Sequence, residues 1–160
     1  MTMDAGYTHV YTGEGKGKTT CALGLALRAA GAGKRVFIGQ FIKDGEYSEI
    51  KAIKEYLPMI KLEQFGKNFA AGYEKAMETL TKGGYDLVIF DEINTAVRKG
   101  FISEEDVLAL MDAKPEAAEL VLTGRYATEA IIGKADLVTE MRPLKHYFKN
   151  GVRARTGIEK

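Results

Sequence analysis

The sequence has little cysteine, little proline and no tryptophan. Cys21 is the single cysteine in 160 residues. An intramolecular disulfide is therefore excluded, and a reducing, cytoplasmic location is expected. No apolar run approaches the roughly 18 residues that a membrane-spanning helix requires, and residues 1–6 lack the charged and apolar regions of a signal peptide. We expect a cytoplasmic protein without a membrane segment.

The sequence also has no excess of either charge. Lys and Arg number 23 against 22 Asp and Glu, for a formal net charge of +1. Such a balance gives no overall field that would gather nucleic acid or an anionic membrane, so neither is an expected partner. Hydrophobic residues make up 46% of the chain, which is enough for an ordinary core. Without linkers, repeats or low-complexity segments, residues 1–160 are predicted to form a single domain.

A glycine- and lysine-rich run, Thr12-Gly-Glu-Gly-Lys-Gly-Lys-Thr-Thr20, is the most informative feature that is present. Its glycines allow the backbone N–H groups to point inward around a phosphate, while Lys18 can reach a phosphate and Thr19 can hold Mg²⁺. The pattern G-x-x-x-x-G-K-[ST] expects a glycine where this chain has Thr12, and the first glycine is displaced to Gly13. The run still predicts a nucleoside triphosphate site at the start of a helix.

Segments with strand and helix patterns alternate along the whole chain. Strands are predicted over residues 7–12, 35–41, 59–65, 85–90, 119–122 and 136–141, and helices over 18–32, 48–56, 69–81, 104–111 and 126–133. This alternation predicts an α/β protein with the three-layer P-loop NTPase fold, in which a mostly parallel central sheet is covered by helices on both faces. Ligands are then expected at the carboxyl ends of the strands.

Two carboxylates, Asp91 and Glu92, follow the apolar run Leu87 to Phe90. With Thr19 they supply the oxygen ligands that Mg²⁺, or Mn²⁺ in its place, requires beside a triphosphate. The alternative is that the pair caps a helix starting at Ile93. The residues alone leave open whether the second carboxylate positions a water for hydrolysis or serves only the metal.

The phosphate site by itself is shared by several function classes, among them P-loop ATPases or small-molecule kinases and nucleotide-dependent interaction modules. A kinase would commonly add an arginine-rich lid, and a guanine-nucleotide switch would need an N-K-x-D motif. Neither is present in the sequence.

Several further motifs give the chain a specific resemblance. They are Leu27-Arg-Ala-Ala-Gly31, Gln40-Phe-Ile-Lys43, Phe90-Asp-Glu-Ile-Asn94, Leu122-Thr-Gly-Arg125, Glu140-Met-Arg-Pro-Leu-Lys-His146 and Gly151-Val-Arg-Ala-Arg-Thr-Gly-Ile158. Together with the phosphate loop, they make the chain similar to the P-loop class of ATP:corrinoid adenosyltransferases, also called cob(I)alamin adenosyltransferases. The selective part is the R-P-x-K-H segment followed by G-V-x-A-x-x-G-I.

The resemblance implies that the cobalt(I) of a reduced corrinoid, cobalamin or cobinamide, attacks the 5′ carbon of ATP and expels triphosphate, in adenosylcobalamin synthesis or salvage. It implies no general acid or base, and it makes Glu92 a ligand of the metal with Thr19, supported by Asp91. A homodimer and a reducing flavoprotein as electron donor are also implied. The residues that this resemblance assigns to the nucleotide are Gly13, Glu14, Gly15, Lys16, Gly17, Lys18, Thr19, Thr20, Arg28 and Arg125.

On the corrinoid side the resemblance implies an aromatic residue against the lower corrin face. Phe69 is the first candidate and Phe65 the second, with Asn94 as a further corrinoid-side candidate. The segment from 65 to 69 is shorter than in the best-known family members and lacks their tryptophan. The first predicted strand begins about six residues into the sequence, so a long N-terminal helix that covers the corrinoid in some relatives is not expected, and a dimer partner could replace it. The basic tail from Lys145 to Lys160 could contact corrinoid side chains or form a solvated surface.

Overall fold

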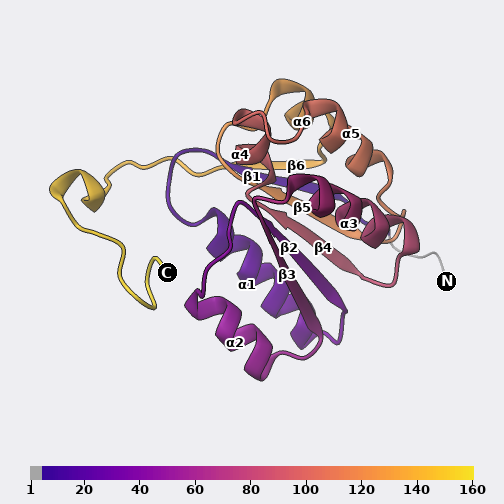
Figure 1. The fold of residues 1–160 in the computed structure, drawn as a ribbon, viewed down its shortest axis with the longest axis horizontal. Helices are drawn as coiled ribbons and strands as arrows, with labels where there is room; N and C mark the ends of the chain where they lie inside the picture. The colour runs from indigo at the N-terminus through magenta and orange to yellow at the C-terminus, as the bar shows by residue number, and fades with distance from the viewer. Residues whose placement is uncertain (1–4) are drawn as a thin grey trace.

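The computed structural model describes residues 5–160, and within them six strands form one sheet in which every neighbouring pair is parallel (Figure 1). The strands are β1 (Thr8–Thr12), β2 (Val36–Phe41), β3 (Ile60–Gly66), β4 (Leu87–Asp91), β5 (Glu119–Thr123) and β6 (Leu137–Glu140). Their order across the sheet is β3-β2-β4-β5-β1-β6. The predicted parallel sheet is confirmed. Because β4 lies between β2 and β5, the residues that end these three strands meet at one edge.

Helices cover both faces of the sheet, as the alternating pattern predicts. They are α1 (Lys18–Gly31), α2 (Ser48–Tyr56), α3 (Phe69–Lys82), α4 (Ile93–Arg98), α5 (Glu104–Asp112) and α6 (Glu129–Lys134). The first two pack on one face through a buried cluster that includes Ala26 and Ile53. The other four pack on the opposite face, where Leu80, Ala96 and Leu110 belong to a second cluster (Figure 1). None of the helices described from residue 5 onward is long and apolar enough to cross a membrane.

Most predicted elements differ from the observed ones only at their ends. The largest shift is at α6, which begins at Glu129 instead of residue 126, because Tyr126 has a left-handed φ of 62° that a helix cannot include. Thr128 caps this helix by accepting a hydrogen bond from the Ile131 N–H. At the start of α5, Ser103 and Asp106 form a reciprocal capping box.

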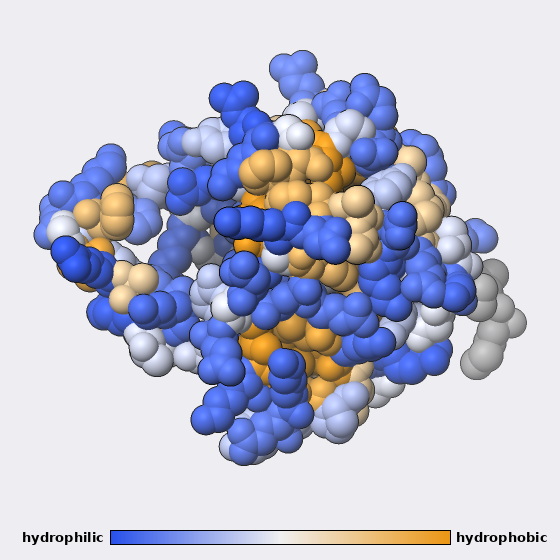
Figure 2. Space-filling view, in the orientation of Figure 1, coloured by the Kyte–Doolittle hydropathy of each residue, from blue (hydrophilic) through white to orange (hydrophobic). Residues whose placement is uncertain are grey.

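The chain leaves the sheet after β6 as a tail over residues 141–160. It includes one short 3₁₀ helix, η1 (Tyr147–Asn150), and Figure 1 shows this yellow segment standing away from the body before it turns back. Most of the tail surface is hydrophilic in Figure 2, although the large side chains of Leu144 and Phe148 are exposed. The end of the tail returns to α2, where the Ser48 hydroxyl donates to the Lys160 carbonyl at 3.1 Å.

Candidate nucleotide-binding site

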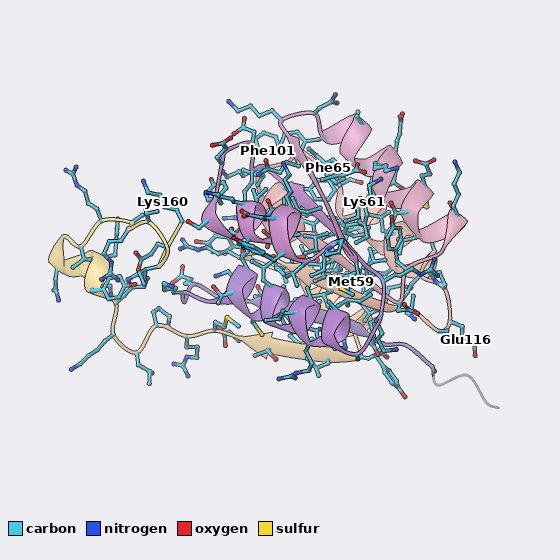
Figure 3. The ribbon with its side chains drawn as sticks, turned by 90° about the horizontal axis from the view of Figure 1, so that it is seen from below. Met59, Lys61, Phe65, Phe101, Glu116 and Lys160 are labelled. Atoms are coloured by element: carbon cyan, nitrogen blue, oxygen red, sulfur yellow. The ribbon has the colours of Figure 1, made fainter. Side chains whose placement is uncertain are left out.

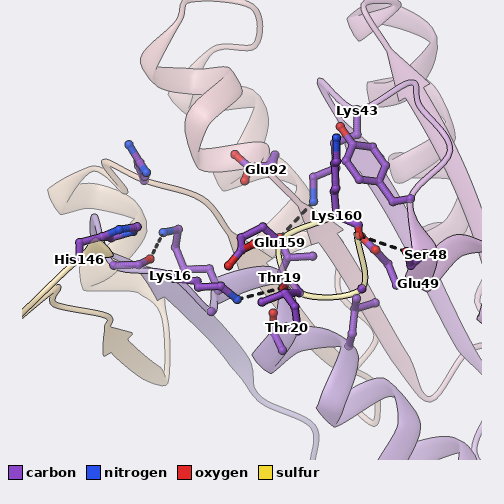
Figure 4. Close-up of a pocket in the computed structure, with 18 residues that line it drawn as sticks. Lys16, Thr19, Thr20, Lys43, Ser48, Glu49, Glu92, His146, Glu159 and Lys160 are labelled. Atoms are coloured by element: carbon purple, nitrogen blue, oxygen red, sulfur yellow. Dashed lines mark hydrogen bonds between the residues drawn. The ribbon is translucent and has the colours of Figure 1, made fainter. Parts of the chain in front are cut away.

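A cavity of about 500 Å³ opens at the carboxyl end of the sheet, beside the start of α1 (Figure 4). Predicted residues that line it are Gly15, Lys16, Gly17, Lys18, Thr19, Thr20, Glu92 and Arg125. Other lining residues were not predicted to face a nucleotide, and they are Leu23, Lys43, Tyr47, Ser48, Glu49, His146 and Gly157 to Lys160. The structure therefore brings most of the predicted phosphate residues together and adds a second wall from α2 and the tail.

The position of the first glycine in the loop follows from a close backbone contact. Gly13 has a φ of +97°, and a Cβ there would lie 2.5 Å from the Met141 carbonyl oxygen. The Gly15 N–H donates to this same oxygen at 2.7 Å. Thr12, which stands where the motif has glycine, is buried, and its hydroxyl accepts from the Ala127 N–H at 3.2 Å. The displaced glycine thus lets the loop pack against the chain that follows β6.

Lys18 begins α1 and is only 7% exposed. Its ammonium group donates to the Gly15 carbonyl at 2.7 Å. The group therefore lies against the loop in which a phosphate would bind. Burial lowers the pKa of Lys18, and the charge of Arg125 lowers it further. Gly17, with a φ of +113°, precedes the helix and offers no side-chain cap. The first N–H groups of α1 are therefore free to bind an anion.

Asp91 is the centre of a buried polar cluster at the edge of the sheet. It is 1% exposed, and each of its two carboxylate oxygens accepts two hydrogen bonds. Oδ1 accepts from the hydroxyls of Thr19 at 2.9 Å and Thr123 at 2.6 Å. Oδ2 accepts from the Gln40 amide at 3.1 Å and from the Lys43 ammonium at 2.8 Å. The order of β2, β4 and β5 accounts for this cluster, since each strand ends beside the next.

Lys43 carries a stable positive charge in this cluster. Burial opposes the charge, but the charge and hydrogen bond of Asp91 outweigh it, so the pKa of Lys43 lies above its ordinary value. Its ammonium also donates to Thr19 Oγ1 at 3.2 Å and lies 5.7 Å from the centre of the Tyr47 ring. Sequence reasoning did not assign this lysine a role, and neither did it assign one to Gln40, the polar side chain in the otherwise apolar and fully buried strand β2.

Glu92 differs from its neighbour in both conformation and exposure. Its φ is 63°, a left-handed value that costs a non-glycine residue about 1 kcal/mol or more. The backbone N–H of Glu92 donates to Thr123 Oγ1 at 3.0 Å, while the side chain makes no capping hydrogen bond to α4 and lines the cavity. Asp91 is anchored in the protein, and Glu92 faces the space where a ligand would lie.

The side-chain oxygen atoms of Thr19, Asp91 and Glu92 fit a magnesium ion that is bound together with phosphates. Within residues 5–160 no three His, Cys, Asp or Glu side chains gather closely enough to hold a metal by themselves. A divalent cation beside Thr19 would therefore take part of its ligands from phosphate and water, as Mg²⁺ commonly does. The Lys43 ammonium already lies against Thr19 and Asp91, which indicates that this position favours a positive charge.

Replacing Glu92 with glycine tests two effects separately: the strain of its left-handed backbone and the binding role of its carboxylate. Because glycine adopts positive φ without strain, we expect Glu92→Gly to leave the free energy of unfolding unchanged or to raise it by up to about 1 kcal/mol. Removing the carboxylate should at the same time weaken Mg²⁺-dependent ATP binding about tenfold. Urea denaturation and calorimetric titration measure the two effects. Glu92→Gln is the control, with the same loss of binding and no gain in stability. A clear loss of stability in the glycine variant would contradict the strain at Glu92, and unchanged Mg²⁺-dependent ATP binding in both variants would contradict its ligand role.

Two arginines that were predicted to contact ATP lie in different places. Arg125 follows β5 and lines the cavity. Arg28 lies in the last turn of α1, is exposed, and is not among the residues that line the cavity; its charge acts on Tyr11. Its assignment to ATP stays a prediction. Glu14 is turned toward Tyr126, whose hydroxyl donates to Glu14 Oε1 at 3.2 Å.

The corrinoid-side candidates lie outside the cavity. Phe65 packs edge-on against Phe41, with ring centres 5.0 Å apart, and belongs to the edge of the core. Phe69 stacks on Phe101 at 4.4 Å, with 17° between the ring planes. Phe101 lies toward the same end of the molecule as Lys160, opposite Glu116 (Figure 3). Asn94 is fully buried, and both polar atoms of its amide lack a hydrogen-bond partner among the described residues.

The end of the tail closes one side of the cavity. The Lys16 ammonium donates to the Ile158 carbonyl at 3.1 Å, and Ser48 holds Lys160 from α2 (Figure 4). Both contacts are to backbone atoms of the tail. A lysine ammonium has three donors, so Lys16 can bind a triphosphate while it still donates to the Ile158 carbonyl.

The carboxylate of Glu159 also lines the cavity, between these two contacts (Figure 4). Hydrogen bonds from Arg155 and Tyr147 hold the pKa of Glu159 at about 2. The Arg155 guanidinium neutralises it at 3.0 Å and stacks over the Tyr147 ring. The tail thus presents to the site a carboxylate that is already paired with Arg155.

A family model matches residues 4–159, nearly the whole chain. Its description is "ATP:corrinoid adenosyltransferase BtuR/CobO/CobP".

Curated proteins from several bacteria are similar over almost the full chain. The Corrinoid adenosyltransferase of Pseudomonas aeruginosa is 33% identical, with 98% of this chain and 84% of that protein covered. The Corrinoid adenosyltransferase of Escherichia coli K12 is 32% identical, over 98% of this chain and 86% of the relative. The Corrinoid adenosyltransferase CobA of Salmonella typhimurium is 34% identical with the same coverage.

Proposed function

Since this chain belongs to the family of ATP:corrinoid adenosyltransferases, it transfers the adenosyl group of ATP to a corrinoid, and we propose how its site does so. The acceptor is the cobalt(I) of a reduced corrinoid, and the leaving group is inorganic triphosphate. The observation that carries this proposal is the phosphate cavity, in which a buried lysine and the start of α1 face a hydroxyl–carboxylate cluster.

The reaction is a displacement at the 5′ carbon that moves two electron pairs. The cobalt(I) pair forms the cobalt–carbon bond as the bond from that carbon to the triphosphate oxygen breaks, and the second pair leaves with the triphosphate. No proton has to be removed from a nucleophile, so the site needs no general base. The protein must align the two substrates and stabilise the charge that develops on the leaving oxygen.

The residues of the phosphate loop hold that leaving group. Lys18 and the first N–H groups of α1 bind phosphate oxygens, and Lys16 binds them with the donors that the Ile158 carbonyl does not use. Thr19 and Glu92 would hold Mg²⁺, while Asp91 fixes the Thr19 hydroxyl through the 2.9 Å hydrogen bond. When bound, the ion neutralises triphosphate charge.

We also propose a homodimer in the cytoplasm and a reduced flavoprotein as the source of electrons. The exposed residues of the edge strand β6 support self-association, because Leu137 and Val138 lie open to solvent there. A dimer partner would also provide cover for the corrinoid.

Anaerobic incubation with chemically reduced cobalamin and ATP tests the activity. The expected result is the absorption spectrum of a cobalt–carbon bond that light destroys. Conversion of ATP without that spectral change would overturn the proposal and favour an ATPase or a kinase.

Phe69 is proposed to approach the lower face of the corrin and exclude an axial ligand from cobalt(II). Without such a ligand the metal accepts an electron more readily. Phe69→Ala should leave ATP affinity unchanged and lower the rate with a cobalt(II) substrate and reductant about tenfold, with a smaller effect on prereduced cobalt(I). Tyr56→Ala, which truncates an exposed ring on α2, is the control. An unchanged rate with cobalt(II) would remove Phe69 from this role.

A further inference from the structure

Lys43 lies where the proposed metal ion and its phosphates would meet. It follows β2 by two residues, and its side chain is mostly buried but lines the cavity. The ammonium nitrogen is 2.8 Å from Asp91 Oδ2 and 3.2 Å from Thr19 Oγ1. This side chain provides the positive charge between the two oxygens.

The hydrogen-bonding capacity of Asp91 is already filled. A carboxylate offers about four acceptor positions, and Thr19, Thr123, Gln40 and Lys43 use four. A water molecule on a metal ion beside Thr19 can therefore reach Asp91 only if one of these donors leaves.

Lys43 is the donor best able to leave. Thr123 is fully buried and also accepts from the Glu92 N–H, so it is fixed by the backbone. Gln40 is fully buried as well, and its amide oxygen accepts from Gln64 at 3.2 Å. Lys43 instead has a flexible stem that reaches the cavity wall.

Charge repulsion leads to the same conclusion. An ammonium group and a divalent cation cannot both contact Thr19 Oγ1 at close range without strong repulsion. Lys18 and Arg125 approach the cavity from the phosphate loop and β5, whereas Lys43 approaches from β2 on the other side of Asp91. An ammonium that leaves Asp91 toward the cavity would meet the triphosphate from that side.

We propose that Lys43 is a third triphosphate-binding lysine, one that exchanges partners: it holds Asp91 and Thr19 before the ligand binds, yields them to the metal, and then binds the leaving triphosphate. This inference rests on the proposed function, because it takes MgATP as the ligand. Lys43 then has opposite effects on two affinities. Its ammonium lowers the affinity for the metal alone, because the two compete, and raises the affinity for the metal–triphosphate complex.

Those opposite effects can be measured without turnover. Lys43→Met and Lys43→Gln each remove the charge, and the glutamine keeps a donor for Asp91 in case the methionine variant does not fold. Mn²⁺ alone, followed by electron paramagnetic resonance, should bind about tenfold more tightly to either variant. Mg²⁺ with inorganic tripolyphosphate, followed by calorimetry, should bind about ten- to a hundredfold more weakly. Lys51→Met, on the exposed side of α2, should change neither affinity.

The outcomes separate this inference from the proposed function. If both affinities move in the same direction, or if tripolyphosphate binding is unchanged, the exchange of partners is wrong although the wild-type protein still forms the cobalt–carbon bond. If the wild-type protein binds neither MgATP nor Mg²⁺-tripolyphosphate, the proposed function fails and the role of Lys43 fails with it.

Discussion

Lys18→Met is expected to weaken MgATP binding about a hundredfold and to reduce adenosyl transfer about a thousandfold. The ammonium of Lys18 is buried beside the phosphate loop and donates to the Gly15 carbonyl, so it is positioned before ATP arrives. Its pKa is lowered chiefly by burial, and a bound triphosphate would stabilise its charged form. Calorimetric titration and the cobalt–carbon assay measure the two losses.

The fold itself should tolerate this substitution. Lys18 takes part in no ion pair with Asp91, and methionine retains the length of the buried stem. Lys34→Met is the matched control, because Lys34 is an exposed lysine just beyond the other end of α1. A Lys18→Met protein that binds MgATP within about threefold of the wild type would show that the triphosphate lies elsewhere.

Asp91→Asn is expected to lower the free energy of unfolding by about 3 kcal/mol and to abolish detectable Mg²⁺-dependent ATP binding. The substitution leaves the Lys43 charge partly buried without its carboxylate, and an amide nitrogen would face donors from Thr19, Thr123 or Gln40. Urea denaturation followed by circular dichroism measures the loss of stability.

Two comparisons test this explanation. Asp112→Asn breaks an ion pair with Lys134 in which the aspartate side chain is 69% exposed, and it should cost less than about 1 kcal/mol. Lys43→Met combined with Asp91→Asn should be more stable than Asp91→Asn alone, because the uncompensated charge is gone. If the double variant is no more stable, the charge of Lys43 is not the cause.

The parts of the fold that depend on local sequence were predictable. The loop at Thr12 to Thr20 is bounded by a β-branched strand and an alanine-rich helix, and the structure places it between β1 and α1. The pair Asp91 and Glu92 ends an apolar run that reads directly as a buried strand. The displaced glycine in the loop was visible in the sequence too. The contact that explains it, with the backbone of Met141, comes from far along the chain and could not be predicted.

The contacts that depend on the order of strands could not be predicted in this way. Gln40 and Thr123 reach Asp91 because β2 and β5 flank β4, which no local pattern specifies. A glutamine in an otherwise apolar strand indicates that a buried hydrogen-bond partner exists, but it does not indicate which residue that partner is. The same limit applies to Phe101, whose stacking on Phe69 joins the loop before α5 to the start of α3.

Different roles for the two adjacent carboxylates also required the structure. Sequence reasoning named both as candidates for the metal and left helix capping open. The left-handed φ of Glu92 turns the backbone at the end of β4, so that Asp91 stays in the cluster while Glu92 lines the cavity. This separation makes the Glu92→Gly and Asp91→Asn predictions opposite in their effect on stability.

The fate of the phosphates tests the central claim most directly. In a single anaerobic turnover with ATP and prereduced corrinoid, ³¹P nuclear magnetic resonance should show one inorganic triphosphate released for each cobalt–carbon bond formed, because the bond to the 5′ carbon is the one that breaks. Orthophosphate with ADP, or phosphate release without the new cobalt–carbon bond, would contradict the account.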